Sequence, residues 1–325
     1  MNTTVLMKYV AALVALAICS ACGSSSAVAP STAVNGMLVT AAHANLSALR
    51  HYVPIVPDRH AKPKIFEYII NYYDSYAGIF DYPKSDRQIG TINDVGGQGC
   101  TNVLHGYGRK TFWIVAGASQ ITKYEVPDTP IKTLAVSVGA PSSCAINRVG
   151  DLAVGILYGS GGGDVVIFQH QSGSGTVYTT PLAREYFDGY DNHGNLFADG
   201  FSGGSAFELI ELPKGSSKFQ TIATSNTVKF PGSVQWDGKY LAVTDQLADA
   251  IYQYTVSGTA AKLEGTVSLA GAGDCAQTWI AVGVVFCADA GNEDGEVYNY
   301  PAGGSAVAVF TGNFDLPLGV VAAKK

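Results

Sequence analysis

Four aspartates hold matching places along the sequence and are the first candidates for chemistry. Asp74, Asp199, Asp245 and Asp289 each follow a short apolar run and precede a polar turn. A carboxylate in that place commonly accepts backbone N–H hydrogen bonds from the turn. Several such carboxylates gathered at one end of the fold could instead bind a cation or a sugar-like ligand. The sequence alone leaves both interpretations open.

The other residue types that support catalysis show no recognisable arrangement. His105 and His193 have no partner at i+4 and no cysteine pair beside them, so neither resembles a zinc ligand. The glycine-rich run at 159–164 lies between two expected strands, whereas a phosphate-binding loop opens a helix. The run at 188–195 lacks the alternate ligand spacing of a calcium loop, which favours a hairpin turn. We therefore assign no catalytic residue.

The composition indicates a large all-β domain. The 325 residues include 38 glycines and 18 tyrosines, only 14% are charged, and no long stretch has the apolar period of a buried helix. The net charge of −6 comes without basic blocks, whereas nucleic-acid binding requires clustered Lys and Arg. We expect no nucleic-acid partner.

One unit of short strands and glycine-rich or aspartate-rich turns repeats from about residue 64 onward. The third strand of each unit is the easiest to align, and its end falls at Tyr82, Val126, His170, Leu212, Tyr254 and Tyr300. The successive spacings are 44, 44, 42, 42 and 46 residues. Four short strands per unit with such a period are typical of β-propeller blades. We predict a six-bladed β-propeller over residues 63–325.

The two ends of the repeat region complement each other. The first unit begins at 68–74 with the equivalent of a second strand, and 316–323 supplies an extra strand after the sixth unit. A C-terminal strand in the first blade would close the ring and remove an open sheet edge. We therefore predict closure of the first blade by the C-terminus.

The N-terminus carries an export signal. From Met7 the chain has one lysine and then about ten apolar residues, too few for a membrane span of about 20 residues. Residues 1–21 are therefore predicted to be a cleaved signal peptide. Residues 22–62 are rich in Ser, Ala and Pro, which predicts a flexible linker.

Ser20 and Ala21 before Cys22 resemble the cleavage box of bacterial lipoproteins, in which the cysteine becomes the lipid-modified first residue. The resemblance implies lipidation of Cys22 and attachment to a membrane of the cell envelope. Cys19 stands where that family usually has Leu, and a plain secretory signal is the alternative.

Four cysteines remain in the predicted mature chain. They are Cys100, Cys144, Cys275 and Cys287. An even number in an oxidising compartment favours two disulfides. Cys100 and Cys144 open the innermost strands of adjacent units, while Cys275 and Cys287 face each other across one hairpin. We predict Cys100–Cys144 and Cys275–Cys287 over the two other pairings, with four free thiols as the alternative.

The segments 196–215, 241–254 and 284–304 resemble NHL-type and gluconolactonase-like six-bladed propellers, in which a second strand ends in Asp before a polar turn. In the gluconolactonase-like enzymes a divalent metal lies at the channel mouth, held by acidic and amide side chains. The resemblance implies Glu185 and Asp188 as first candidate ligands of a calcium-like cation. Further candidates are Gln98, Asn102, Asn147, Gln235, Asp274, Gln277 and Asp315.

Two functions are compatible with these observations. The first is a tethered binding module whose propeller presents a loop-rich face to a carbohydrate, peptide or protein. The alternative, implied by the resemblance, is a metal-dependent lactonase-like hydrolase with its site at the channel mouth. The lack of a recognisable catalytic set favours the binding module.

Overall fold

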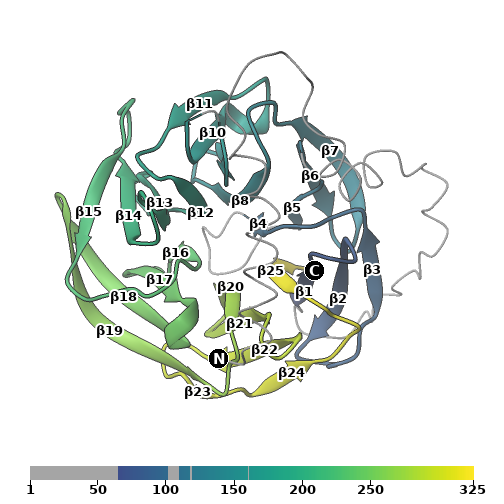
Figure 1. The fold of residues 1–325 in the computed structure, drawn as a ribbon. Helices are drawn as coiled ribbons and strands as arrows, with labels where there is room; N and C mark the ends of the chain where they lie inside the picture. Colours follow the sequence, from purple (N-terminus) through teal and green to yellow (C-terminus); the bar gives the residue numbers. More distant parts are fainter. Residues whose placement is uncertain (1–64, 102–109, 118, 160) are drawn as a thin grey trace.

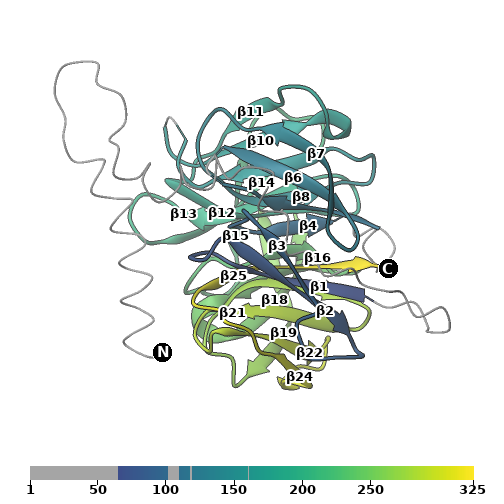
Figure 2. The same cartoon turned by 90° about the vertical axis from the view of Figure 1, so that its right-hand side faces the viewer.

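The computed structural model describes residues 65–101, 110–117, 119–159 and 161–325, and they form an all-β, propeller-like arrangement of sheets around a central axis (Figures 1 and 2). The predicted signal peptide (1–21), lipidated Cys22, linker (22–62), Asn102 and His105 lie outside the described residues. Among the described residues, no helix is long and apolar enough to cross a membrane.

Three of the sheets are formed by the first eleven strands and the last one. The first sheet contains β25 (Pro317–Lys324), β1 (Ile65–Asn71), β2 (Tyr76–Tyr82) and β3 (Gly90–Asn93). The second contains β4 (Gly99–Thr101), β5 (Thr111–Val115), β6 (Gln120–Glu125) and β7 (Thr129–Ala135). The third contains β8 (Pro141–Ile146), β9 (Leu152–Ile156), β10 (Asp164–Phe168) and β11 (Thr176–Thr179), with the short 3₁₀ helix η3 (Gln169–Gln171) after β10.

The next two runs of four strands follow the same antiparallel order. One contains β12 (Arg184–Tyr190), β13 (Leu196–Phe201), β14 (Phe207–Leu212) and β15 (Gln220–Thr224). The other contains β16 (Val234–Trp236), β17 (Leu241–Asp245), β18 (Ala250–Ser257) and β19 (Ala260–Ala270), with η4 (Gln246–Ala248) after β17. The last sheet contains β20 (Cys275–Ala281), β21 (Val284–Asp289), β22 (Asp294–Asn299) and β24 (Ala308–Phe310).

The sequence repeat predicts six separate sheets, but backbone pairing joins two of them. β15 and β19 pair in parallel at Ala223–Ala260 and Thr224–Ala261. β19 also pairs in parallel with the short strand β23 (Gly304–Ser305). Because β19 is long enough to reach both neighbours, backbone pairing joins two four-strand runs and β23 into one nine-stranded sheet. The described strands therefore form five hydrogen-bonded sheets.

The C-terminal strand completes the sheet that β1 begins, as predicted. β25 runs antiparallel to β1 from Ile65–Lys324 to Asn71–Pro317. The Gln277 side chain strengthens this closure, since Nε2 donates to the Gly99 carbonyl (2.9 Å) and Oε1 accepts from the N–H groups of Gly99 (3.2 Å) and Val320 (2.8 Å). One side chain on β20 thus connects β4 and β25.

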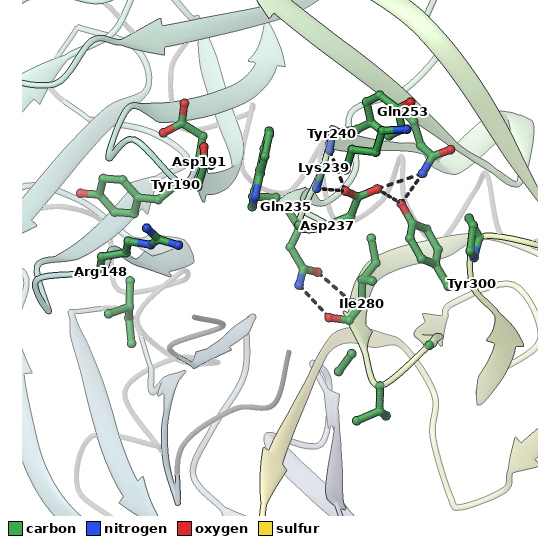
Figure 3. Close-up of a pocket in the computed structure, with 18 of the residues that line it drawn as sticks. Arg148, Tyr190, Asp191, Gln235, Asp237, Lys239, Tyr240, Gln253, Ile280 and Tyr300 are labelled. Atoms are coloured by element: carbon green, nitrogen blue, oxygen red, sulfur yellow. Dashed lines mark hydrogen bonds between the residues drawn. The ribbon is translucent and has the colours of Figure 1, made fainter. Parts of the chain in front are cut away.

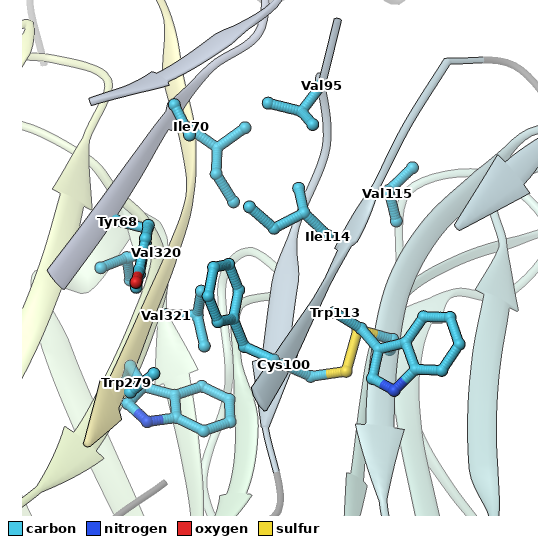
Figure 4. Close-up of a cluster of buried hydrophobic side chains, with 14 of the residues drawn as sticks. Tyr68, Ile70, Val95, Cys100, Trp113, Ile114, Val115, Trp279, Val320 and Val321 are labelled. Carbon is cyan, nitrogen blue, oxygen red and sulfur yellow. A yellow bond between two sulfur atoms is a disulfide. The ribbon is translucent and has the colours of Figure 1, made fainter. Parts of the chain in front are cut away.

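The main hydrophobic core lies between neighbouring sheets (Figure 4). Trp113 and Tyr68 are fully buried there, beside apolar residues of β25 such as Val321. A Cβ on Gly99 would lie 2.6 Å from Cγ1 of Val321, so a larger residue would push the inner strands apart. This packing requires the alternation of large apolar and small residues on the inner strands.

Both predicted disulfides are confirmed. Cys100–Cys144 connects β4 with β8 in the next sheet, with a Cα–Cα distance of 5.7 Å. Cys275–Cys287 connects β20 with β21, with a Cα–Cα distance of 5.4 Å. The bonds indicate an oxidising, extracytoplasmic environment.

Candidate functional site

Three matching hairpin turns build one side of the candidate site. Oδ1 of Asn147, between β8 and β9, accepts hydrogen bonds of 2.8–3.1 Å from the N–H groups of 149–151. Oδ1 of Asp191, between β12 and β13, does the same for 193–195 at 2.8–2.9 Å. Oδ1 of Asp237, between β16 and β17, accepts two such bonds of 2.7 Å. Each side chain fixes the turn that carries it.

A second network connects the last of these turns to Gln253 on β18 and to Tyr300, which follows β22. Oδ2 of Asp237 accepts hydrogen bonds from the Tyr300 hydroxyl (2.6 Å) and from Nε2 of Gln253 (2.9 Å). The same amide lies 2.9 Å from the Tyr300 hydroxyl. Burial, and then the hydrogen bond to Asp237, raises the pKa of Tyr300 above its ordinary value. The phenol is therefore a neutral donor at physiological pH.

A hollow of about 770 Å³ opens between these turns (Figure 3). Its lining includes Asn147, Arg148, Tyr190, Asp191, Gln235, Trp236, Asp237, Lys239, Tyr240, Gln253, Ile280 and Tyr300. Arg148 lies on one side, across the hollow from the Asp237 and Tyr300 network. Gln235 and Ile280 lie between the two sides and are joined by hydrogen bonds of 2.9 and 2.8 Å. The volume is in the range of pockets that bind small ligands.

Arg148 belongs to two further hollows beside the first. One has a volume of about 530 Å³ and includes Tyr178, His193 and Lys214. The other has a volume of about 220 Å³ and includes Lys123. The Arg148 side chain is exposed and makes no hydrogen bond or ion pair with any residue the structure describes. It is therefore available to a ligand in any of the three hollows.

Glu185 and Asp188, the predicted metal ligands, lie together on β12. The hydroxyl of Ser143 is 3.1 Å from Oε1 of Glu185 and 2.8 Å from Oδ2 of Asp188, and the Ser142 hydroxyl is 3.1 Å from Oε2 of Glu185. Gly155 makes room for the pair, since a Cβ there would lie 2.0 Å from Oε2 of Glu185. The cluster is thus built across the boundary between two sheets.

The protonation of this pair follows from its geometry. Burial raises the pKa of Asp188 to about 7 and that of Glu185 well above its usual range, with the charge of Asp188 adding to the second effect. Ser143 has one hydroxyl proton, which can serve only one of the two carboxylates it contacts. A proton retained on the pair supplies the second hydrogen bond, because two buried like charges cannot both ionise easily.

The space beside Asp188 is small. Gln98, Asp188, Ser233, Gln277 and neighbouring side chains line a hollow of about 10 Å³ on the central axis. A volume of that size holds about one water molecule. In the part of the chain that the structure describes, Glu185 and Asp188 belong to no group of three or more closely spaced Asp, Glu, His or Cys donor atoms.

The one such group among the described residues is formed by Cys275, Cys287, Asp289 and Glu296. The two sulfur atoms are bonded to each other and do not offer thiolate ligands. This group therefore does not resemble a metal centre.

Three of the recurring aspartates accept hydrogen bonds from backbone N–H groups. Asp199 accepts one of 3.2 Å from Gly232. Asp245 accepts from Lys229 (2.7 Å), Phe230 (3.2 Å) and Ala248 (3.2 Å). Asp289 accepts from four N–H groups within residues 273–292, at 2.7–3.0 Å. These carboxylates hold turns, which is the first of the two interpretations that the sequence left open.

Of the other polar candidates, Gln98, Gln235 and Gln277 line the small hollow beside Asp188, and Asn147 does not. Asn147 follows the end of β8 and lies in the hairpin turn, so it is at the opposite end of that strand from the residues that open it, among which it was expected. In Gln235 and Gln277, the side-chain amide oxygen and nitrogen are both hydrogen-bonded to backbone groups of neighbouring strands. Burial, and then the charge of Asp289, raises the pKa of Asp274 to about 8. Side chains already paired within the fold are poor cation ligands.

Two residues of the large hollow, Asn147 and Gln235, were sequence candidates, although as metal ligands, and the other lining residues were missed. The hairpin turns at 147–151, 190–195 and 236–240 are visible as polar segments at matching places in three repeats. Trp236 lies in one of these turns, and Tyr300 follows the third strand of the last repeat. These two aromatic residues are the sequence signal that could have indicated a common binding face. His193 lies in its turn, as expected, and its side chain is exposed.

Solved structures support the β-propeller fold. A protein of unknown function from Bacteroides caccae has a TM-score of 0.57 at 12% identity, covering 81% of this chain and 99% of its own. A chain of a nidogen/laminin complex has a TM-score of 0.60 at 10% identity, covering 80% and 98%. A functionally unknown protein from Desulfotomaculum acetoxidans DSM 771 has a TM-score of 0.52 at 8% identity, covering 79% and 98%.

No protein-family model matches the chain, and no curated protein matches its sequence. At these low identities the structural neighbours establish the fold and leave activity to be argued from the site.

Proposed function

We propose that the protein is an exported lipoprotein, held at a membrane by a lipid on Cys22, whose NHL-like six-bladed propeller is a binding module. The ligand binds in the large hollow at the hairpin-turn face, between Arg148 and the Asp237–Tyr300 network. The observation that carries this proposal is the convergence of three hollows on Arg148, which is unpaired among the described residues and lies beside a hydrogen-bonded polar network and aromatic side chains.

The six-blade count rests on the antiparallel runs within the sheets. Each run of four strands, β12–β15 and β16–β19 included, repeats the same order from the inner strand outward. The parallel β15–β19 contact spans two residue pairs and joins outer strands of neighbouring blades. Counting each antiparallel run as one blade gives the six units of the sequence repeat.

The prearranged hydrogen bonds favour binding over catalysis. Asp237 accepts four hydrogen bonds within the protein, so it lacks a free lone pair that could act as a base. The space beside Glu185 and Asp188 holds about one water molecule and no lactone. A rigid hollow lined by aromatic and polar groups instead suits recognition.

The fold also occurs in an assembly of proteins, since one structural neighbour is a chain of a nidogen/laminin complex. This supports a binding role in general terms. The ligand of the present protein has to be identified by experiment.

An array of immobilised oligosaccharides and peptides tests the proposed function. The wild-type protein is compared with Trp236→Ala in the hollow and with Leu247→Ala, which removes an exposed side chain at the opposite end of β17. We expect ligands that bind wild type and Leu247→Ala but bind Trp236→Ala at least about tenfold more weakly, as for loss of an aromatic anchor. Equal binding by all three proteins would place the ligand elsewhere.

Labelling of the cells with a fatty-acid analogue tests the anchor. We expect incorporation into the wild-type protein and none into Cys22→Ala. Incorporation that persists in Cys22→Ala, or none in either protein, would favour the plain secretory signal.

A further inference from the structure

Resting on the proposed function, we propose that the hollow binds an acidic oligosaccharide. Arg148 recognises a sugar carboxylate, and Trp236 provides an apolar face for the sugar ring. Arginine suits this role because its planar guanidinium donates two parallel hydrogen bonds to a carboxylate. The Arg148 side chain is exposed and unpaired among the described residues, and it lies across the hollow from the Asp237 network.

The charges around the hollows favour an anionic ligand. Four basic side chains line the three hollows, namely Lys123, Arg148, Lys214 and Lys239. Three carboxylates line them as well: Asp151, Asp191 and Asp237. The chain as a whole carries a net charge of −6, so this face departs from the rest of the molecule in sign.

The three carboxylates are also already satisfied. Asp151 accepts from the His170 N–H (2.9 Å) and from Nδ2 of Asn147 (3.0 Å). Asp191 accepts three turn N–H groups and Nδ2 of Asn195. These internal hydrogen bonds occupy the carboxylate oxygens, whereas the guanidinium of Arg148 has no hydrogen-bond or ion-pair partner among the described residues. Arg148 is therefore an exposed cation with which a ligand carboxylate can pair.

The shape of the site favours a saccharide over an extended peptide. A peptide that adds to a sheet needs unpaired N–H and C=O groups along a strand edge. Here the face is formed by hairpin turns whose N–H groups are bonded to Asn147, Asp191 and Asp237. Half-buried Trp236 and the amide and hydroxyl groups of Gln253 and Tyr300 instead offer a ring face with polar groups at fixed positions.

Calorimetric titration with short oligogalacturonate and with the matching neutral galactose oligomer tests the inference. We expect the wild-type protein to bind the acidic oligomer more tightly. Arg148→Gln should weaken that binding by about 10- to 100-fold, the effect of removing a charge-assisted hydrogen bond. The matched control is Arg87→Gln, which removes an exposed arginine outside the hollows and should leave the affinity within about twofold.

The outcomes separate this inference from the proposed function. If both oligomers bind equally, and Trp236→Ala but not Arg148→Gln weakens them, the binding face stands and the acidic ligand is wrong. If the acidic oligomer does not bind while array peptides bind through Trp236, the saccharide inference fails and the proposed function holds. If the acidic oligomer binds equally to wild type and to both Arg148→Gln and Trp236→Ala, both proposals fail.

Discussion

The hydroxyl of Tyr300 donates a 2.6 Å hydrogen bond to Oδ2 of Asp237, although 63 residues separate the two along the chain. Asp237 belongs to the turn between β16 and β17, and Tyr300 follows β22 in the next blade. The contact therefore fixes the relative position of two neighbouring units at the rim of the large hollow. A site fixed in this way needs little rearrangement to bind a ligand.

Replacing Tyr300 with Phe tests that network. The change removes one donor to a half-buried carboxylate and keeps the ring, so we expect the free energy of unfolding to fall by about 1–3 kcal/mol. Chemical denaturation measures it. Tyr178→Phe is the control, because its hydroxyl has no hydrogen-bond partner among the described residues, and it should change stability by less than about 0.5 kcal/mol. Similar losses in both variants would contradict the network.

The two disulfides should differ in their contribution to stability. Cys100–Cys144 closes a segment with a sequence separation of 44, and Cys275–Cys287 one of 12. Loop-closure entropy gives about 4 and about 3 kcal/mol, respectively. We therefore expect the Cys100→Ser/Cys144→Ser variant to melt at a lower temperature than Cys275→Ser/Cys287→Ser under oxidising conditions. The reverse order would show that local contacts around the hairpin outweigh the entropy of the longer loop.

The buried carboxyl pair predicts a pH dependence of stability. Burial raises the pKa of Asp188 to about 7 in the folded protein, above the value of about 4 for an unfolded chain. The folded state then binds more protons, so the free energy of unfolding is greatest at low pH and falls as the pH rises through the folded pKa. Denaturant titrations from about pH 5 to about pH 8 should show this decline.

Glu185→Gln is the diagnostic variant for that decline. A neutral amide of nearly the same volume removes one of the two ionising groups, so the fall in stability should become shallower. Glu125→Gln, an exposed residue on β6, is the matched control and should keep the wild-type slope. An unchanged slope in Glu185→Gln would show that other groups cause the dependence.

Metal analysis tests the cation that the sequence resemblance implied at Glu185 and Asp188. Because the pair can hold a proton and belongs to no group of three closely spaced Asp, Glu, His or Cys donor atoms among the described residues, we expect substoichiometric calcium in the purified protein. Chelator should leave the melting temperature unchanged. One bound metal ion per chain in the wild-type protein, absent from Glu185→Gln, would contradict the shared proton and support a metal centre at this pair.

The ring closure and both disulfides could be predicted from the sequence because they follow from the repeat. Aligning the third strands places Cys100 and Cys144 at matching positions and leaves 316–323 as the partner of the first unit. Strand periodicity and the spacing of turns are local signals, so they can be recognised in the sequence without knowledge of tertiary contacts.

The hollow and the fused sheet could not be predicted in the same way. Arg148, Trp236 and Tyr300 belong to different repeats, and their convergence depends on the twist of the blades and the exact length of β8 and β16. The β15–β19 pairing depends on how far β19 extends beyond its own blade. Such contacts depend on three-dimensional geometry that no short sequence pattern records.

Hydrogen–deuterium exchange with and without the best ligand from the array tests the central claim most directly. Binding in the large hollow predicts slower exchange in the hairpin turns at 147–151, 191–195 and 236–240. It also predicts unchanged exchange at 246–249 and 290–294, at the opposite ends of β17 and β21. Slower exchange at those opposite ends, with the three turns unaffected, would contradict the proposed binding face.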